Sequence, residues 1–322
     1  MIRAGIIGGA GYTGGELIRL LLRHPECNIS YIYSRSQAGR KIEEIHTDLL
    51  GDTELKFSNS LSWEIDLLYL CLEHGKSAQF ITDHEIPDSI KIIDLSRDFR
   101  LSSRETRQFC YGLPELNRED IRTADNIANP GCFAAALQLG ILPLAQNKLL
   151  NGDLHISGIT GATGAGRNPS DTTHFSWRSS NISLYKGFEH QHLKEVNKSI
   201  FQLHEQWKGS IRFLPFRGSF SRGILAALYT KSDASLEKIK KLYLDYYRPH
   251  PFVFLSDKNP DVKMAVNTNK CLLHLEKHED TLLIVSVIDN LIKGASGQAV
   301  QNMNLMFGLN EKAGLELKAS VF

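Results

Sequence analysis

The feature that most constrains the fold is an alternation of short apolar strands and helices in the first part of the chain. Ile2–Gly8 is an apolar run that ends in glycine, and Thr13–Arg23 follows with leucines at helical spacing. The pattern continues with strands at Cys27–Tyr33, Ile65–Cys71 and Ile90–Leu95 and a helix at Gly75–Thr82. Such β-α-β alternation predicts a protein of the α/β class with a Rossmann-like, doubly wound parallel sheet.

The second part of the chain has a different character, with longer strands and less helix between them. Helices are expected at Cys132–Ala145 and His190–Leu203, and a last one near Ser296. The predicted strands are Asp153–Thr160, Ile211–Phe216, Ile224–Thr230, Cys271–Lys277 and Leu282–Ile288. This pattern predicts a separate α+β domain with a mixed or antiparallel sheet, and 322 residues suit two domains.

Composition excludes several classes of function. The formal charge of +1 gives no global reason to bind nucleic acid or an anionic membrane, and no apolar run approaches the roughly 20 residues that span a bilayer. The five cysteines are an odd number and contain no CxxC, so reduced thiols in a cytoplasmic protein are expected rather than disulfides or a metal site. The strand at Ile2 leaves no room for a cleavable signal before the fold.

A glycine-rich turn joins the first strand to the first helix. Gly8, Gly11 and Gly14 form GxxGxxG, with Tyr12 and Thr13 at the start of the helix. Glycine lets the backbone approach a pyrophosphate, and the helix N-terminus offers free N–H groups and a positive dipole end. The turn therefore predicts a dinucleotide site; the alternative is a purely structural turn.

The end of the second strand selects the dinucleotide. NAD enzymes usually place a carboxylate there for the ribose hydroxyls, whereas this chain has Ser34, Arg35 and Ser36, with Arg40 beyond them. Arginine and serine can bind a 2′-phosphate, which a carboxylate would repel. NADP is therefore the predicted cofactor, unless these residues form only a solvated basic loop.

One cysteine lies where its thiol can act as a nucleophile. Asn129 begins an Asn-Pro-Gly turn, and Cys132 follows it at the start of an alanine-rich helix. A helix N-terminus favours the thiolate, and its N–H groups can stabilise an oxyanion. A proton partner is predicted at His192, which shares a helix face with Glu195 three residues later. The carboxylate would orient the imidazole.

The motifs of the chain, taken together, resemble one enzyme family. They are, in order, Gly8–Leu17 (GGAGYTGGEL), Asp94–Leu101 (DLSRDFRL), Tyr111–Leu116 (YGLPEL), Asn129–Ala134 (NPGCFA), Gly161–Arg167 (GATGAGR), His190–Val196 (HQHLKEV), Arg222–Leu225 (RGIL) and Asp289–Gly308 (DNLIKGASGQAVQNMNLMFG). The set covers nearly the whole chain and resembles the N-acetyl-gamma-glutamyl-phosphate reductases of arginine biosynthesis. NPGC alone is shared loosely with aspartate-semialdehyde dehydrogenases.

The resemblance implies an NADPH-dependent reduction of N-acetyl-γ-glutamyl phosphate to the 5-semialdehyde through a thioester, the third step of arginine biosynthesis. It implies an NADP-binding domain at residues 1–131 and 295–322, and a catalytic domain at 132–294 that also forms a homo-oligomer, a dimer or a tetramer. The family's nucleophile maps on Cys132, and its acid/base maps on His192 of H-x-H-x-x-E.

Further site residues follow from position and family motifs. Gly161, Gly164 and Asn290 are assigned to the cofactor side. The substrate and its phosphate are assigned to the residues Arg97, Arg100, Glu115 and Asn129. The two arginines follow a strand at the carboxyl edge of the sheet, where ligands bind. The family motif supports Arg100 over Arg97, and a surface loop is the alternative for both.

Three departures from the family pattern concern the substrate pocket. Thr160 and Thr163 replace serines in the glycine loop, and Phe216 replaces the histidine of a usual Pro-His pair. Arg217-Gly218-Ser219 stands where an apolar Leu-Val-Pro is usual. The N-acyl group therefore stays open between acetyl, the family default, and a larger or charged group such as succinyl.

Three other functions are compatible with parts of the sequence. Aspartate-semialdehyde dehydrogenase would use the same chemistry, but YGLPEL and the C-terminal motif argue against it. A non-catalytic NADP-binding regulator would need neither NPGC nor HQHLKE. A thiol-based redox sensor lacks a resolving cysteine nearby, since Cys110 is the closest in sequence.

Overall fold

The computed structural model describes residues 1–101 and 107–320. Its internal contacts divide the chain into two compact units. The N-terminal unit comprises Met1–Pro130 and Ala295–Glu316, and the C-terminal unit comprises Gly131–Gly294 and the tail from Leu317. The predicted first domain extends to residue 322, and its last two residues lie outside the described ranges.

The N-terminal unit contains a seven-stranded sheet in which every pairing is parallel. Its strands are β1 (Ile2–Ile7), β2 (Cys27–Tyr33), β3 (Phe57–Ser58), β4 (Leu67–Leu70), β5 (Lys91–Asp94), β6 (Cys110–Tyr111) and β7 (Asn126–Ala128). The order β3-β2-β1-β4-β5-β7-β6 reverses direction between β1 and β4. This confirms the predicted doubly wound sheet, and the carboxyl ends of β1 and β4 flank its switch point.

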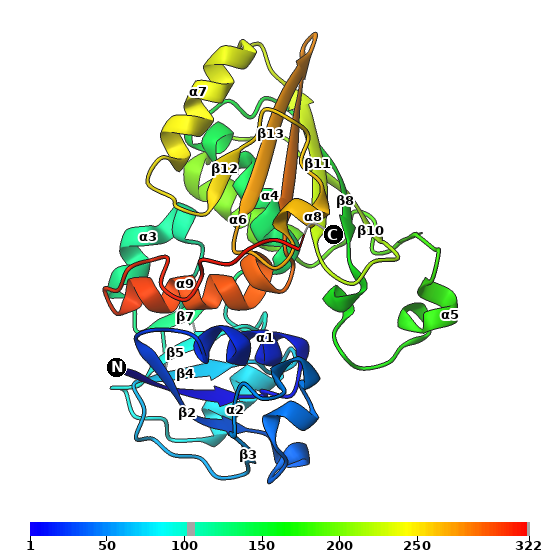
Figure 1. The fold of residues 1–322 in the computed structure, drawn as a ribbon. Helices are drawn as coiled ribbons and strands as arrows, with labels where there is room; N and C mark the ends of the chain where they lie inside the picture. Colours follow the sequence, from blue (N-terminus) through cyan, green and yellow to red (C-terminus); the bar gives the residue numbers. More distant parts are fainter. Residues whose placement is uncertain (102–106, 321–322) are drawn as a thin grey trace. The chain divides into compact units, whose positions relative to one another are not determined.

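The described residues of this unit form four α-helices: α1 (Tyr12–Leu21), α2 (Lys76–Asp83), α3 (Pro114–Thr123) and α9 (Gly297–Met306). Helix α9 follows a π-helical segment at Ile292–Ser296 and packs against α1 and α3 (Figure 1). All ten residues of α9 are buried, so it forms part of the core although it comes from the end of the chain.

The C-terminal unit contains a second seven-stranded sheet, and it is mixed as predicted. Its strands are β8 (Leu154–Thr160), β9 (Ser183–Leu184), β10 (Ile211–Arg217), β11 (Ile224–Lys231), β12 (Val253–Leu255), β13 (Cys271–His278) and β14 (Thr281–Ile288). The order is β12-β13-β14-β11-β8-β10-β9, with parallel pairing only at β8–β10 and β12–β13. Long antiparallel ladders join β14 to β11 and β13.

One face of the mixed sheet is covered by helices. Helix α4 (Cys132–Gln146) packs on β11, β13 and β14, and α6 (Leu193–Leu203) and α7 (Leu236–Tyr247) pack against α4 (Figure 1). The segment with α5 (Phe175–Arg178) projects from the sheet, and α8 (Val262–Ala265) precedes β13. In the described part of the chain, no helix has both the length and the apolar character to cross a membrane.

The predicted helix at His190–Leu203 was wrong at its start. Residues 190–192 form a turn, in which the backbone N–H of His192 donates to Nδ1 of His190 at 3.3 Å. Helix α6 therefore begins at Leu193, with His192 as its N-cap residue. The side chain of His192 consequently lies at the helix terminus and not on a helix face.

Candidate active site

The glycine turn after β1 is shaped by close backbone contacts. Gly8 has φ +82°, and a Cβ there would lie 2.5 Å from the carbonyl oxygen of Cys71. A Cβ on Gly14 would lie 2.7 Å from Cα of Gly9. At Gly11, in contrast, the nearest atom would be 4.0 Å away, so the turn is open there. Gly8 and Gly14 are therefore closely packed, whereas Gly11 has open space beside it.

The N-terminus of α1 is suited to an anion. No side chain caps it, and its first turn, which includes Tyr12 and Thr13, contains no acidic residue. Ser296 donates to the carbonyl oxygen of Thr13 at 2.7 Å, so α9 supports the turn. His46 contacts the carbonyl oxygen of Gly9 at 2.7 Å, a support that no motif indicated. Free N–H groups at a rigid turn are what a dinucleotide pyrophosphate requires.

The two candidate arginines beyond β2 differ in their surroundings. Nε of Arg35 donates to the hydroxyl of Tyr33 at 2.8 Å, and among the described residues no carboxylate forms an ion pair with Arg35. Arg40, in contrast, is paired with Glu44 at 3.0 Å. Ser34 is buried and Ser36 is exposed. The exposed guanidinium of Arg35 is therefore the one available for a phosphate.

The carboxyl ends of β5 and β7 are joined by Arg100. Its Nε donates to the carbonyl oxygen of Asn129 at 2.8 Å, and its second amino group donates to that of Leu95 at 3.1 Å. Asn129 is itself held, since its amide donates to Ala295 at 3.0 Å. Arg97 is exposed on the same loop. The structure thus brings Arg97, Arg100 and Asn129 to one edge of the sheet.

Two carboxyl groups in the described part of the N-terminal unit, those of Asp94 and Glu115, are buried. Asp94 ends β5 and accepts hydrogen bonds from the hydroxyl of Ser96 at 2.7 Å and from its backbone N–H at 3.1 Å. Burial raises the pKa of Asp94 to about 6, against the effect of its hydrogen bonds. Glu115 is buried in the first turn of α3, directly after Pro114, which begins that helix.

Cys132 is the first residue of α4, as predicted from the turn that precedes it. Gly131 is the N-cap residue, and no side chain caps the helix. Cys132 is partly exposed, whereas all the following residues of the helix are buried as far as Ala145. In contrast, Cys27 and Cys271 are buried, and burial raises the pKa of the Cys27 thiol to about 12. Only the thiol at the helix N-terminus combines accessibility with a favourable dipole.

His192 lies against the residue that precedes the nucleophile. A Cβ on Gly131 would lie 2.4 Å from Nε2 of His192, so only glycine allows the imidazole to approach this closely. Gly294 has a similar role, since a Cβ there would lie 2.8 Å from Cβ of Cys132. The structure therefore brings Cys132 and His192 together, which is the arrangement that a thiol and its proton partner need.

Glu195 and His190 complete this cluster. Oε2 of Glu195, which is 4% exposed, accepts the backbone N–H of Gly131 at 3.0 Å and so fixes the start of α4. His190 is packed against Phe133, Phe213 and His192. Burial, aided by Lys186, lowers the pKa of His190 to about 4. His190 is therefore neutral near pH 7 and orders the backbone of His192. The sequence favoured His192 over His190 because of its spacing to Glu195 and because of the family motif.

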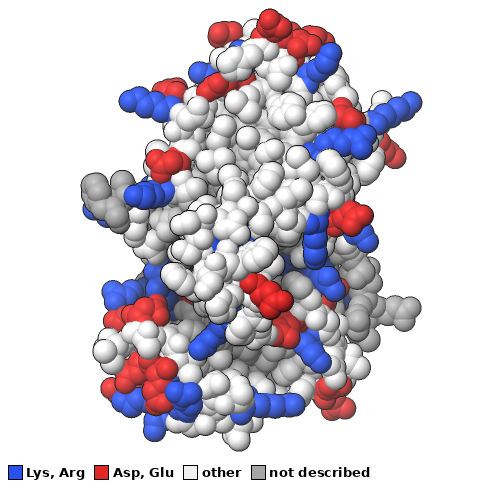
Figure 2. All heavy atoms as spheres, turned by 90° about the vertical axis from the view of Figure 1, so that its right-hand side faces the viewer, with Lys and Arg blue, Asp and Glu red and all other residues white. Residues whose placement is uncertain are grey.

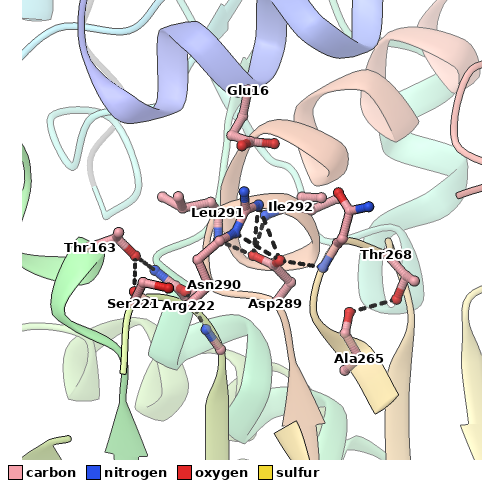
Figure 3. A network of polar contacts seen from close by, with 12 residues as sticks. Glu16, Thr163, Ser221, Arg222, Ala265, Thr268, Asp289, Asn290, Leu291 and Ile292 are labelled. Carbon is pink, nitrogen blue, oxygen red and sulfur yellow. Dashed lines mark hydrogen bonds and ion pairs between the residues drawn. The ribbon is translucent and has the colours of Figure 1, made fainter. Parts of the chain in front are cut away.

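The glycine loop after β8 belongs to a second polar cluster, shown in Figure 3. Nδ2 of Asn290 donates to the hydroxyl of Thr163 at 3.0 Å, and its Oδ1 accepts the N–H of Gly223 at 2.7 Å. A Cβ on Gly161 would lie 2.5 Å from the carbonyl oxygen of Ser221. Gly164, with Thr160 and Asn290 as neighbours, completes the loop. Three predicted cofactor residues are thus brought together within the C-terminal unit.

Sequence reasoning missed Asp289, which lies at the centre of Figure 3. Its carboxylate is fully buried and forms an ion pair with Arg222 at 3.1 Å. It also accepts backbone N–H groups from Asn267 at 2.7 Å and Leu291 at 2.8 Å. The signal was present, because Arg222 and Asp289 each stand in a family motif, but nothing in the sequence paired them.

Both parts of the chain match models of known domains. Residues 3–124 match the NAD binding domain of semialdehyde dehydrogenases, and residues 132–290 match their dimerisation domain. Among solved structures, aspartate semialdehyde dehydrogenase II of Vibrio cholerae aligns with a TM-score of 0.75 over 96% of this chain and 98% of its own, at 16% identity. The enzyme of Candida albicans, solved with NADP, aligns with a TM-score of 0.70 over 95% and 99%, at 17% identity. The fold and the cysteine-histidine cluster define a protein of the semialdehyde dehydrogenase class.

Sequence relatives narrow the class. The N-acetyl-gamma-glutamyl-phosphate reductase of Parabacteroides distasonis is 56% identical over the full length of both chains, and so is that of Christiangramia forsetii. That of Bacteroides thetaiotaomicron is 55% identical over the same extent. The chain belongs to the N-acetyl-gamma-glutamyl-phosphate reductase family, which confirms the resemblance found in its motifs.

Proposed function

We propose that this protein is an NADPH-dependent reductase that converts N-acetyl-γ-glutamyl phosphate to N-acetylglutamate 5-semialdehyde and phosphate, the third step of arginine biosynthesis. The observation that carries the proposal is the packing of His192 on Gly131, beside Cys132 at the N-terminus of α4. Full-length relatives at 56% identity carry the name of this activity.

The covalent step is assigned to Cys132. Its thiolate attacks the γ-carbonyl carbon, and N–H groups at the start of α4 stabilise the oxyanion. A carbon–sulfur bond forms, and the bond to phosphate breaks with its electron pair leaving on the phosphate. Bound NADPH supplies hydride to the thioester carbonyl. The thiohemiacetal then collapses, which breaks the carbon–sulfur bond, and His192 transfers the protons.

The remaining assignments concern binding. Gly8, Gly11 and Gly14, with the N-terminus of α1 at Tyr12 and Thr13, would hold the pyrophosphate. Ser34, Arg35 and Ser36 would hold the 2′-phosphate, and Gly161, Gly164 and Asn290 would line the nicotinamide side. Phosphate from the substrate would meet Arg97 or Arg100, and Glu115 and Asn129 would shape the substrate site. Glu195 acts on His192 through the start of α4.

The reverse reaction tests this proposal. Purified protein with NADP, phosphate and N-acetylglutamate semialdehyde should form NADPH only when phosphate is present. Cys132→Ser should lose nearly all of this activity and keep the far-UV circular dichroism of the folded protein, because no thioester can form. Cys27→Ser is the matched control and should stay active, since Cys27 is buried in β2.

Other outcomes would contradict the proposal. Turnover of aspartate semialdehyde in place of the glutamate compounds would make the protein an aspartate-semialdehyde dehydrogenase that uses the same Cys132 chemistry. Binding of NADPH without turnover of any semialdehyde would identify a non-catalytic regulator.

Assembly and location are also proposed. The match of residues 132–290 to a dimerisation domain supports a homo-oligomer. We assign the interface to the face of the mixed sheet opposite α4, where residues of β8 and β11 alternate between buried and more exposed. A biosynthetic enzyme with free thiols would work in the cytoplasm.

A further inference from the structure

Arg217, the last residue of β10, has an unusual environment. Its guanidinium carbon lies 4.7 Å from the centre of the Tyr185 ring. Its Nε is buried and has no hydrogen-bond partner. Within the described ranges no carboxylate lies at ion-pair distance from this guanidinium. The Arg217 side chain is partly buried, and a guanidinium with a buried, unpaired N–H gains when an anion joins it.

A second arginine increases the positive charge at this place. Arg178 is buried and donates to the carbonyl oxygens of Arg217 and Thr172 and to the hydroxyl of Ser183. Burial lowers the pKa of Arg178, and the charge of Arg217 lowers it further. Arg178 also has no carboxylate partner among the residues that the structure describes. The guanidinium of Arg178 donates to other protein groups, and its hydrogen bond to the carbonyl oxygen of Arg217 fixes the backbone at that residue.

A continuous row of rings leads from Arg217 to the nucleophile. Tyr185 contacts His190 with ring centres 5.7 Å apart, and His190 contacts His192 at 4.7 Å. His192 lies on Gly131, next to Cys132. Burial raises the pKa of Tyr185, a charge on Cys132 would raise it further, and Arg217 opposes both. Tyr185 is therefore close to the thiol on one side and to Arg217 on the other.

We propose that Arg217 determines specificity by binding a carboxylate at the far end of the substrate's N-acyl group, so that the preferred substrate carries a dicarboxylic acyl group such as succinyl. This inference rests on the proposed reductase function and changes only the acyl group. The α-carboxylate and the phosphate are common to every substrate of this reaction, whereas Arg217 stands where the family motif is apolar. Arginine and carboxylate form strong, geometrically defined pairs.

The test compares two semialdehydes in the reverse assay with NADP and phosphate. The wild-type protein should oxidise N-succinylglutamate semialdehyde with a kcat/KM at least about tenfold above that for the N-acetyl compound, because a charged hydrogen bond is gained. Arg217→Leu should lower kcat/KM for the succinyl compound by about 10–100-fold and leave the acetyl compound within about twofold. Arg217→Lys, which keeps the charge, should retain part of the preference.

Arg212→Leu is the matched control, because Arg212 lies on the same strand but is exposed and paired with Asp153 at 3.2 Å. It should leave the ratio of the two kcat/KM values unchanged. That ratio does not depend on the amount of folded enzyme, so partial misfolding of a variant does not obscure it.

Two results would overturn the inference and leave the proposed reductase function intact. One is an equal loss on both substrates in Arg217→Leu, which would assign Arg217 to the α-carboxylate or the phosphate. The other is a wild-type protein without preference for the succinyl compound. A wild-type protein inactive with both compounds would instead contradict the reductase function itself.

Discussion

Arg35 and Arg40, which both follow β2, differ in the groups that they contact, and this difference decides which of them can bind a phosphate. Arg35 rests on the hydroxyl of Tyr33 and is exposed, whereas Arg40 is neutralised by Glu44. On the face drawn in Figure 2, basic side chains are mixed with acidic ones and do not gather in one patch. With a net charge of +1, anion binding depends on such individual unpaired cations.

Arg35→Gln should therefore weaken the use of NADPH selectively. We expect kcat/KM for NADPH to fall about tenfold or more, while that for NADH stays nearly unchanged, because only NADPH carries the 2′-phosphate. Steady-state kinetics with both cofactors measure this. Arg40→Gln is the control, and a larger effect from Arg40 than from Arg35 would show that the 2′-phosphate lies elsewhere.

At this scale the sequence predicted the residues that stand in motifs and missed those that act through space. Cys132 could be placed at a helix N-terminus because Asn-Pro-Gly precedes an alanine-rich run. Tyr185 and Arg178 could not be found, because their importance comes from contacts with Arg217, 39 residues beyond Arg178 in the chain. Arg217 itself was visible only as a departure from the usual motif.

At the scale of elements, the start of α4 is the point where the candidate catalytic groups meet. Glu195 binds the N–H of Gly131, and His192 occupies the space that a side chain at 131 would need. One glycine thereby sets the distance between a helix and the turn before α6. The position of Cys132 relative to His192 depends on both contacts.

Gly131→Ala tests this contact. Its φ of −71° suits alanine, so the backbone need not strain, but the new Cβ would displace the imidazole. We expect kcat to fall by about 100-fold, with a small change in Tm, because a displacement of about 1 Å is enough to disrupt catalysis. Gly187→Ala, where a Cβ would make ordinary contacts of 3.7 Å or more, should remain active. Equal activity of the two variants would argue against a catalytic role for the contact.

The carboxyl end of β5 carries a titrating group. The pKa of Asp94 is raised to about 6 by burial, so the folded protein binds a proton there more tightly than the unfolded chain does. The stability that this group provides is present at low pH and is lost as the pH rises through about 6. Asp94→Asn should reduce that loss by up to about 1.4 kcal/mol per pH unit between roughly pH 4 and 6.

Urea denaturation at several pH values measures this effect. The free energy of unfolding of Asp94→Asn should change less with pH than that of the wild type over this window. The control is Asp83→Asn, at the exposed end of α2. Parallel pH profiles of Asp94→Asn and the wild type would show that Asp94 does not titrate there.

Among the elements, those with a clear period or a flanking turn were predictable. The helices α3 and α7 were not predicted, and neither were the four-residue helices α5 and α8. The sequence predicted β2 and most strands of both sheets within a few residues. Helix α3 was missed because the sequence PELNREDIRT has few apolar residues, and only four of its positions are buried. Helix α7 was missed although Ser235 caps it by accepting the N–H of Lys238, because its buried positions are Ile239, Tyr243 and Tyr247 in a run rich in lysine.

At the scale of the whole molecule, α4 covers one face of the mixed sheet, and the short helix α8 packs on the opposite face against β14. Tyr229 of β11 is 44% exposed and stacks on His155 of β8 with ring centres 5.0 Å apart. Ile159 and Leu225 lie on the same face and are partly exposed. Apolar and aromatic surface of this kind is typical of subunit interfaces.

Tyr229→Glu should weaken self-association, because it places a charge on this face. Light scattering after size exclusion should show a smaller mass at low micromolar concentration than for the wild type. Leu244→Glu, at an exposed position of α7 on the helical side, is the control and should keep the wild-type mass. If only Leu244→Glu lowered the mass, the interface would lie on the helices.

The insertion of α9 into the N-terminal unit has a consequence for synthesis of the chain. Residues 1–130 leave the ribosome first, but the helix that fills their core and the hydroxyl of Ser296 that holds the carbonyl of Thr13 are translated about 165 residues later. During that interval the nascent sheet exposes the apolar surface that α1 and α3 later present to α9. The core of the unit that is made first can therefore be completed only after residues 131–294 of the other unit have been translated.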